Sequence, residues 1–482
     1  MTKKIFLLVL SSLILFVTFL IYQKVVFTQR AHNLNLILIS VDTLRPDHMG
    51  IYGYNRNTTP NIDNWAKEAQ IYNNAFTNYP STLQSFYSLF SGRRDFVFDY
   101  EKATNYIVNF DSKKADYGIS SLAKILKDHG YYTTAIVTNP MLGSKFNFFK
   151  DGFNEFYFEN KPNISDDEES FAYDYEKSLL ATEKTLEWID KNSQKKFFLW
   201  IHYDNPHMPY NPPKEYICKI DNNCGDLEKY KDLLEEKKSF SRILKSCTNG
   251  EISNDLKQAA INLYDAEILS ADEQIGILLQ KFKEKNLLEK TVVVFYSDHG
   301  EAFDHDFFGH GWTLYNSTNK IAFILSNPLN KSNKILKNYN YIDNVNIRDI
   351  ILYNLGIVND SNQIFPAKND EIILHASFDN SDKYALIKDN YKYIFTHTAN
   401  INNEDNQGDI KELCDKLGDK EELYNLELDP NEEKNAIQEQ KTIRDSLKEI
   451  LFKKVNLSKL FEQEMNEENK KEIKERLKSI GY

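Results

Sequence analysis

The sequence reads LNLILISVD at residues 34–42 and TVVVFYSDHGE at residues 291–301, so that two apolar runs end in acidic or imidazole side chains. Short apolar runs bounded by polar residues predict buried strands, which would end here at Asp42 and at Asp298. In an open parallel sheet, ligand sites gather outside the carboxyl ends of the strands. We therefore expect Asp42, Asp298 and His299 to share one site.

Working outward from these two strands, the chain alternates between strand and helix patterns. Further apolar strand patterns occur at residues 131–138, 197–203 and 320–325, and helical spacing occurs at 119–129 and 255–284. This alternation predicts an α/β fold, with a mostly parallel central sheet and helices on both faces.

The pattern changes beyond about residue 370. Short strands with Asn/Asp turns are expected to pair antiparallel at 372–376, 384–387 and 391–397. Lys and Glu are dense over 432–480, which predicts an exposed helix. We therefore expect a catalytic domain at 34–365 and a small C-terminal α+β subdomain with a charged helical tail at 366–482.

The N-terminus carries an uncharged apolar run at residues 5–22, directly after Lys3 and Lys4. As a helix this run would be about 27 Å long, close to the thickness of a bilayer core. The flanking lysines favour an anchor with residues 1–4 in the cytoplasm, a linker at 23–33 and a periplasmic or extracellular catalytic domain. A cleaved signal peptide is the alternative.

Composition narrows the class of protein. The formal net charge is −12 and there is no long basic run, so nucleic acid is excluded as a main partner. Four Cys in 482 residues exclude a disulfide-built scaffold. Outside the cytoplasm Cys218 and Cys224 could close a small loop, or they could remain free thiols together with Cys247 and Cys414.

The order of several motifs resembles the sulfatase family of the alkaline-phosphatase-like superfamily over roughly residues 34–435. The motifs are LILISVDTLRPDHMG at 36–50, NAFTNYPSTLQSFYSLFSG at 74–92, FFLWIHYDNPHMPYNPP at 197–213, TVVVFYSDHGEAFDHDFFGHGWTLY at 291–315 and ELYNLELDPNEEKN at 422–435. The resemblance implies transfer of a phosphoryl or sulfuryl group to a metal-bound nucleophile, and from there to water or another acceptor.

The resemblance also implies roles for single residues. Asp42, Asp298 and His299 match metal ligands of the family, and alignment on the turn that ends at Gly92 puts Thr82 at the position of the metal-bound nucleophile. The sequence departs from the family pattern there in three ways, with Thr82 for Cys or Ser, Gln84 for Pro and Phe86 for Arg.

The first departure changes the chemistry. Sulfatases oxidise the Cys or Ser to a formylglycine aldehyde, whereas oxidation of a threonine would give a ketone. We therefore expect an unmodified Thr82 hydroxyl to attack. Ser81 and Ser85 are rival nucleophiles, and the alternative role for Thr82 is to cap the following helix.

Several further side chains are implied to bind the substrate or to move protons. His207 matches the family histidine that contacts the transferring group, and His310 stands where many sulfatases have an anion-binding lysine. His305 and Arg45 are further candidates for substrate binding. The alternatives are a structural or solvent-facing role for His305, and for Arg45 a role in bracing Asp42. Asn139 follows a strand where family members place a polar active-site residue.

The ligand set predicts one divalent ion, zinc or manganese rather than calcium, because it includes an imidazole. Thr82 leads us to expect a phosphoesterase or phosphotransferase acting on extracytoplasmic or envelope phosphoesters, with a glycolipid or glycan as possible substrate. One alternative is a sulfuric ester hydrolase. The other is a catalytically inactive sulfatase-like protein that binds envelope glycans or a partner.

Overall fold

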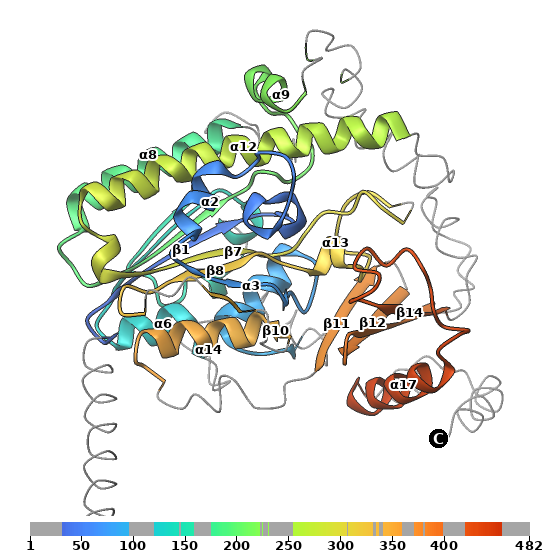
Figure 1. The fold of residues 1–482 in the computed structure, drawn as a ribbon. Coiled ribbons are helices and arrows are strands. Elements are labelled where there is room, and N and C mark those ends of the chain that lie inside the picture. Colours follow the sequence, from blue (N-terminus) through green and yellow to red (C-terminus); the bar gives the residue numbers. More distant parts are fainter. Residues whose placement is uncertain are drawn as a thin grey trace, which may run out of the picture.

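The fold is built on an eight-stranded sheet that lies between two layers of helices (Figure 1). The computed structural model describes residues 31–95, 120–143, 146–158, 175–221, 224, 230, 254–305, 307–330, 334–336, 341–358, 371–378, 381–398 and 420–455. The strand order is β5 (Glu155–Phe158), β4 (Tyr132–Val137), β6 (Phe197–Tyr203), β1 (Asn35–Val41), β7 (Thr291–Ser297), β8 (Phe323–Ser326), β2 (Gln70–Tyr72) and β9 (Lys334–Leu336).

The strand β1 lies in the middle of the sheet because both of its faces are apolar. It pairs in parallel with β6 and β7, with Ile39 beside Ile201 and Phe295. All seven of its residues are buried. Since successive side chains of a strand point to opposite faces, a strand that is covered on both sides reads as one continuous apolar run.

The two faces of the sheet contact different helices. One face packs against α2 (Pro60–Ala66), α8 (Tyr175–Asn192) and α12 (Asn254–Glu284). The other face packs against α3 (Thr82–Ser91), α6 (Leu122–Asp128) and α14 (Asn344–Asn354). The predicted α/β class, with a mostly parallel sheet and helices on both faces, is therefore confirmed. Within the sheet β8 runs antiparallel to both of its neighbours.

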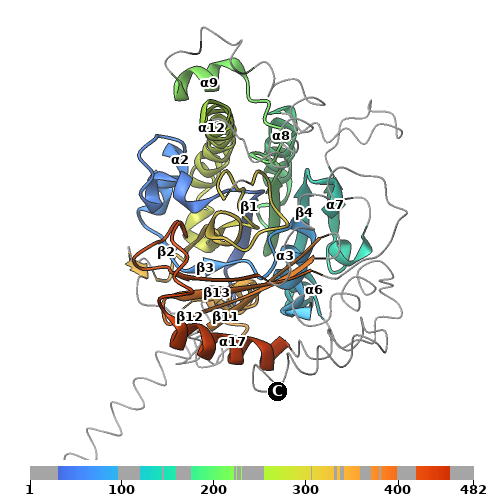
Figure 2. The ribbon, with the colours of Figure 1, turned by 90° about the vertical axis from the view of Figure 1, so that its right-hand side faces the viewer.

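A second, antiparallel sheet follows in the C-terminal part, as Figure 2 shows. Its strands are β11 (Glu371–Phe378), β12 (Ser381–Lys388), β13 (Tyr391–Thr398) and β14 (Lys420–Asn425). The first three were predicted, whereas β14 was missed. The helix α17 (Lys441–Val455) packs on one face of this sheet through Leu447, Leu451 and Phe452. The other face packs on Phe76 and Leu314 of the larger unit.

Some predictions fall outside the described residues. The expected anchor at 5–22 lies there, and so do residues 1–4 and 23–30, the end of the charged tail at 456–482, and Cys247 and Cys414. No helix within the described part of the chain is long and apolar enough to span a bilayer. The structure does pair Cys218 with Cys224 in a disulfide, which closes the small loop that the sequence allowed.

A buried ion pair within the C-terminal part lies against the larger unit. Lys392 on β13 and Glu432 lie 2.7 Å apart and are 0% and 1% exposed. The Lys392 ammonium also donates to the Leu314 carbonyl at 2.9 Å and to the Asn316 side chain at 2.8 Å. Burial lowers the pKa of Lys392, and the Glu432 carboxylate acts against this. The pair therefore holds the C-terminal sheet against the loop that precedes β8.

We expect Glu432→Gln to lower the free energy of unfolding by about 3–5 kcal/mol, because it leaves the Lys392 charge buried without its counter-charge. The double variant Lys392→Met/Glu432→Gln should recover part of this loss. Chemical denaturation gives both values. The control is Arg444→Gln, which breaks a partly exposed pair with Asp445 and should cost less than about 1 kcal/mol. Equal effects of Glu432→Gln and Arg444→Gln would contradict the docking role.

Candidate metal centre and catalytic site

Four predicted side chains meet at the carboxyl ends of the central strands. Asp42 follows β1, Asp298 and His299 follow β7, and Thr82 is the first residue of α3. The His299 Nε2 atom lies 3.6 Å from Asp42 Oδ1 and 3.6 Å from Asp298 Oδ2. The Thr82 hydroxyl oxygen lies 3.2 Å from His299 Nε2 and 3.4 Å from Asp42 Oδ2. All four side chains are buried, so they form one compact donor set.

The backbone fixes which oxygen of Asp298 faces this set. Asp298 Oδ1 accepts hydrogen bonds from the backbone N–H groups of His299 at 2.9 Å and Thr43 at 3.2 Å. Thr43, whose N–H group reaches this oxygen, adopts φ = 53°, a backbone conformation that is rare for a β-branched residue. A side chain at Gly300 would collide with the Ser317 backbone, which explains a glycine directly after His299. Asp298 Oδ2 is left to face the cluster.

The cluster has the electrostatics of a cation site. Burial, reinforced by the Asp298 charge, raises the pKa of Asp42, and burial raises the pKa of Asp298 to about 7. Burial lowers the pKa of His299, so its imidazole is neutral. Asp42 Oδ1 and Asp298 Oδ2 are buried and have no hydrogen-bond partner. Two carboxylate oxygens, an imidazole nitrogen and a hydroxyl fit a divalent ion well.

Among the three candidate nucleophiles, Thr82 is the one whose hydroxyl contacts the side chains of two of these ligands, Asp42 and His299. Ser81 occupies the N-cap position of α3, although its side chain caps no backbone N–H group. The Ser85 hydroxyl donates to the Asp298 carbonyl at 2.7 Å and is bonded to the Tyr296 hydroxyl at 2.8 Å. Ser85 therefore holds the backbone of the predicted ligand Asp298 in place. The N-cap residue of α3 is Ser81, so Thr82 does not have the alternative role of helix cap.

Two histidines flank the cluster. The ring of His310 lies 4.4 Å from that of His299 and 4.8 Å from that of His207, measured between ring centroids. His310 Nδ1 lies 3.0 Å from Glu301 Oε1. Burial alone would lower the pKa of His310, but the Glu301 carboxylate outweighs it and raises that pKa. Burial, helped by His310, lowers the pKa of His207. The arrangement therefore pairs an imidazole whose pKa is raised with one whose pKa is lowered.

Comparison with known proteins identifies the family. A family model described as Sulfatase matches residues 34–356. The chain belongs to the sulfatase family. An arylsulfatase of Clostridium perfringens is 25% identical over 480 residues, which cover 87% of this chain and 94% of the relative. The iduronate 2-sulfatase of Homo sapiens is 26% identical over 328 residues, which cover 59% of this chain and 57% of the relative.

Solved structures support the same fold. A protein in complex with its substrate D-glucosamine-2-N,6-O-disulfate has a TM-score of 0.64 at 16% identity, and the match covers 90% of this chain and 100% of that one. The phosphonate monoester hydrolase of Agrobacterium radiobacter has a TM-score of 0.64 at 15% identity, covering 90% and 96%. At these identities the likeness shows the fold and not the substrate.

The prediction that this sulfatase-family enzyme acts mainly on phosphate esters is wrong. Its curated relatives are sulfatases, and the phosphonate hydrolase shares only its fold. The prediction rested on Thr82, which lacks the chemistry to become formylglycine. A hydroxyl nucleophile can attack sulfur as well as phosphorus, so its identity does not determine which ester is cleaved.

Two residues that were predicted to bind the substrate, Arg45 and His305, lie in a network of contacts beside the cluster. Arg45 pairs with Asp47 at 2.7 Å and donates to the Glu301 carbonyl at 3.0 Å. The His305 ring stacks on Tyr315 with centroids 3.7 Å apart. Both residues line a cavity of about 540 Å³ that also includes Lys257 and Lys320. The contacts of Arg45 and His305 brace the loop between Glu301 and His310, and the role of both residues toward a substrate stays a prediction.

Sequence reasoning missed three residues of the site and left a fourth weakly supported. His202, Asp204 and Glu301 were not singled out, although all three are at most 1% exposed and touch the cluster or its histidines. Asn139, which follows β4, donates to Asp42 Oδ2 at 2.8 Å. The alternation of His202 and Asp204 at the end of an apolar strand was the available signal, since residues two apart share a face.

We expect Asp298→Asn and His299→Ala to weaken metal binding by more than about 100-fold at this cluster, since changes to the outer partners of metal ligands alone cost 10–100-fold. Metal titration of the depleted protein measures this. Asp47→Asn is the matched control, because it removes a nearby carboxylate that pairs with Arg45 and contacts none of the ligands. Parent-like affinity in Asp298→Asn would refute the ligand assignment.

Proposed function

We propose that this protein hydrolyses sulfate esters, with the Thr82 hydroxyl as nucleophile and a divalent cation held by Asp42, Asp298 and His299. The observation that carries the proposal is the position of the Thr82 oxygen, within 3.4 Å of two of these three ligands. Support for sulfate comes from the sulfatase relatives, one of which spans 87% of the chain.

The reaction is a double displacement. Thr82 Oγ1 loses its proton and attacks sulfur, a new oxygen–sulfur bond forms, the bond between sulfur and the alcohol oxygen breaks, and the departing alcohol takes up one proton. Water then attacks the sulfur of the sulfothreonine and the bond to Thr82 breaks. One proton of the water ends on the Thr82 oxygen, which restores the hydroxyl, and the other leaves with sulfate. When bound, the cation supplies positive charge that stabilises the sulfate oxygens and favours loss of the hydroxyl proton.

The surrounding residues assist both steps. The N-terminus of α3 directs its partial positive charge at Thr82, which favours an anion there. The Glu301 carboxylate raises the pKa of His310, which suits His310 to donate a proton to the leaving alcohol. His207, held neutral by its burial, is suited to accept a proton from the incoming water.

We also infer that the reaction takes place outside the cytoplasm, with the chain anchored through residues 5–22. The apolar run behind Lys3 and Lys4 supports this, since its length suits a bilayer. The bridge between Cys218 and Cys224 adds independent support, because structural disulfides persist mainly in oxidising compartments.

We expect the purified protein to cleave aryl sulfates with a kcat/KM more than about 10-fold above that for the matching aryl phosphates, a difference of about 1.4 kcal/mol in transition-state stabilisation. The assay should include sulfated glucosamines and phosphodiesters, with chelator-treated protein as the control. Faster turnover of a phosphate ester would overturn the proposed substrate class. Turnover of no ester at all would favour a binding protein.

We expect Thr82→Ala to lower kcat by several orders of magnitude while the fold stays intact, and Thr82→Ser to keep partial activity because its hydroxyl survives. Ser85→Ala tests a rival nucleophile. Rapid quenching with substrate should yield a peptide at Thr82 that is heavier by about 80 Da, the mass of SO₃, in keeping with covalent catalysis. An adduct on Ser81 or Ser85, or an active Thr82→Ala enzyme, would exclude Thr82 as nucleophile.

A further inference from the structure

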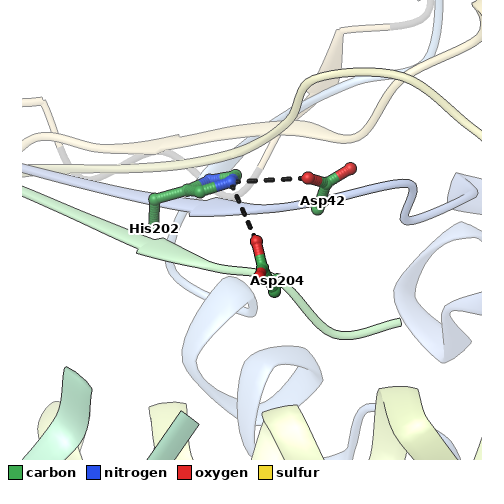
Figure 3. Close-up of side chains that lie close together, drawn as sticks. All are labelled: Asp42, His202 and Asp204. Carbon is green, nitrogen blue, oxygen red and sulfur yellow. Dashed lines mark ion pairs between the residues drawn. The ribbon is translucent and has the colours of Figure 1, made fainter. Parts of the chain in front are cut away.

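A second group of buried ligand atoms lies on the other side of Asp42. The strand β6 runs beside β1 with His202 in register with Ser40, and the Asp42 N–H group donates to the Tyr203 carbonyl at 2.9 Å. His202 and Asp204 are two residues apart, and Figure 3 shows that the carboxylates of Asp42 and Asp204 both point toward the same ring nitrogen of His202. The distances are 3.6 Å from His202 Nε2 to Asp42 Oδ2 and 4.0 Å to Asp204 Oδ1.

The hydrogen bonds of Ser40 show which nitrogen of His202 carries its proton. The Ser40 hydroxyl accepts from the Trp200 indole at 2.9 Å and can donate its own proton to the Ile201 carbonyl at 3.2 Å. Ser40 Oγ lies 2.9 Å from His202 Nδ1, which therefore acts as the donor. A proton on Nδ1 leaves Nε2 of a neutral imidazole with a lone pair, and this lone pair faces two carboxylates.

This arrangement lacks a positive charge at its centre. His202 Nε2 and Asp204 Oδ1 are buried and have no hydrogen-bond partner. A buried lone pair that faces carboxylate oxygens is unfavourable unless a cation or a proton lies between them. Lys177 does not supply this charge from within the cluster, since its ammonium lies 3.5 Å from the other oxygen of Asp204, Oδ2.

Asp42 is placed to serve both groups of ligands. Its Oδ1 atom faces His299 and its Oδ2 atom faces His202, each at 3.6 Å. Asn139 donates to Oδ2 at 2.8 Å, and a carboxylate oxygen with two lone pairs can accept this bond and still bind a cation. One carboxylate can therefore bridge two ions.

We propose that Asp42, His202 and Asp204 form a second divalent-cation site, which shares the Asp42 carboxylate with the first. One imidazole nitrogen and two carboxylate oxygens, all within 4.8 Å of one another, suit zinc or manganese. Ser40 orients His202 and Lys177 orients Asp204, the kind of outer contact that metal ligands usually have. A cation here adds positive charge beside the Thr82 oxygen, which lies 3.4 Å from Asp42 Oδ2.

Metal content tests the proposal without reference to activity, so it can fail while the proposed ester hydrolysis stands. The full chain is saturated with Mn²⁺ or Zn²⁺, desalted and measured by mass spectrometry for metal per chain. We expect about two ions per chain in the parent and about one in His202→Phe and Asp204→Asn, a twofold fall. Asp272→Asn is the matched control, because it changes a fully buried carboxylate that accepts its hydrogen bonds from Asn61 and Ile62, away from the proposed site.

A spectroscopic measurement on the parent protein covers the case in which both variants fail to fold. Two Mn²⁺ ions that share a carboxylate couple magnetically, so the paramagnetic resonance signal of isolated Mn²⁺ should give way to a coupled signal as the second equivalent binds. A parent that saturates at one ion with an isolated signal would overturn the proposal. Metal content equal to the parent in both His202→Phe and Asp204→Asn would also overturn it.

Discussion

The burial of the Asp42 carboxylate is the constraint on which the rest of the site depends. Asp42 is 0% exposed at the end of the central strand, where an ionised carboxylate without a counter-charge would cost several kcal/mol. The chain surrounds it with further carboxylates and neutral imidazoles, whereas Lys177 contacts Asp204 instead. A bound cation supplies the positive charge that these buried carboxylates lack. Its binding explains why polar groups that are costly to bury lie at the centre of a large apolar core.

The outer parts of the fold keep the surrounding loop in place. Lys392 on the C-terminal sheet pairs with Glu432, whose carbonyl accepts a hydrogen bond from His305 at 2.8 Å. The other nitrogen of His305 lies 2.9 Å from Asp304, which is also 3.7 Å from Arg45. This chain of contacts extends from the C-terminal sheet to the loop between Glu301 and His310. The C-terminal part therefore supports the active site although it supplies none of its predicted catalytic side chains.

The identity of the nucleophile, Thr82, does not determine whether the enzyme cleaves phosphate or sulfate esters. Thr82 restricts how the nucleophile can be made, because a threonine cannot yield the formylglycine aldehyde. The ester that is cleaved depends on the groups that surround the transferred anion, and the predicted ones, His207 and His310, come from separate segments. Sequence similarity over most of the chain reflects all of these segments together. It is therefore stronger evidence for the class of substrate than the single substitution at Thr82.

The sequence by itself determined the central strands and the positions at which polar side chains follow them. Those features are local, since an apolar run, a strand end and an adjacent Asp-His pair are visible within about ten residues. The tertiary structure decided which strand ends meet. It placed β6 beside β1, and so brought His202 and Asp204 to Asp42 from a segment about 160 residues away. It also showed that one carboxylate faces two sets of ligands, because only strand order and register determine which side chains share a buried space.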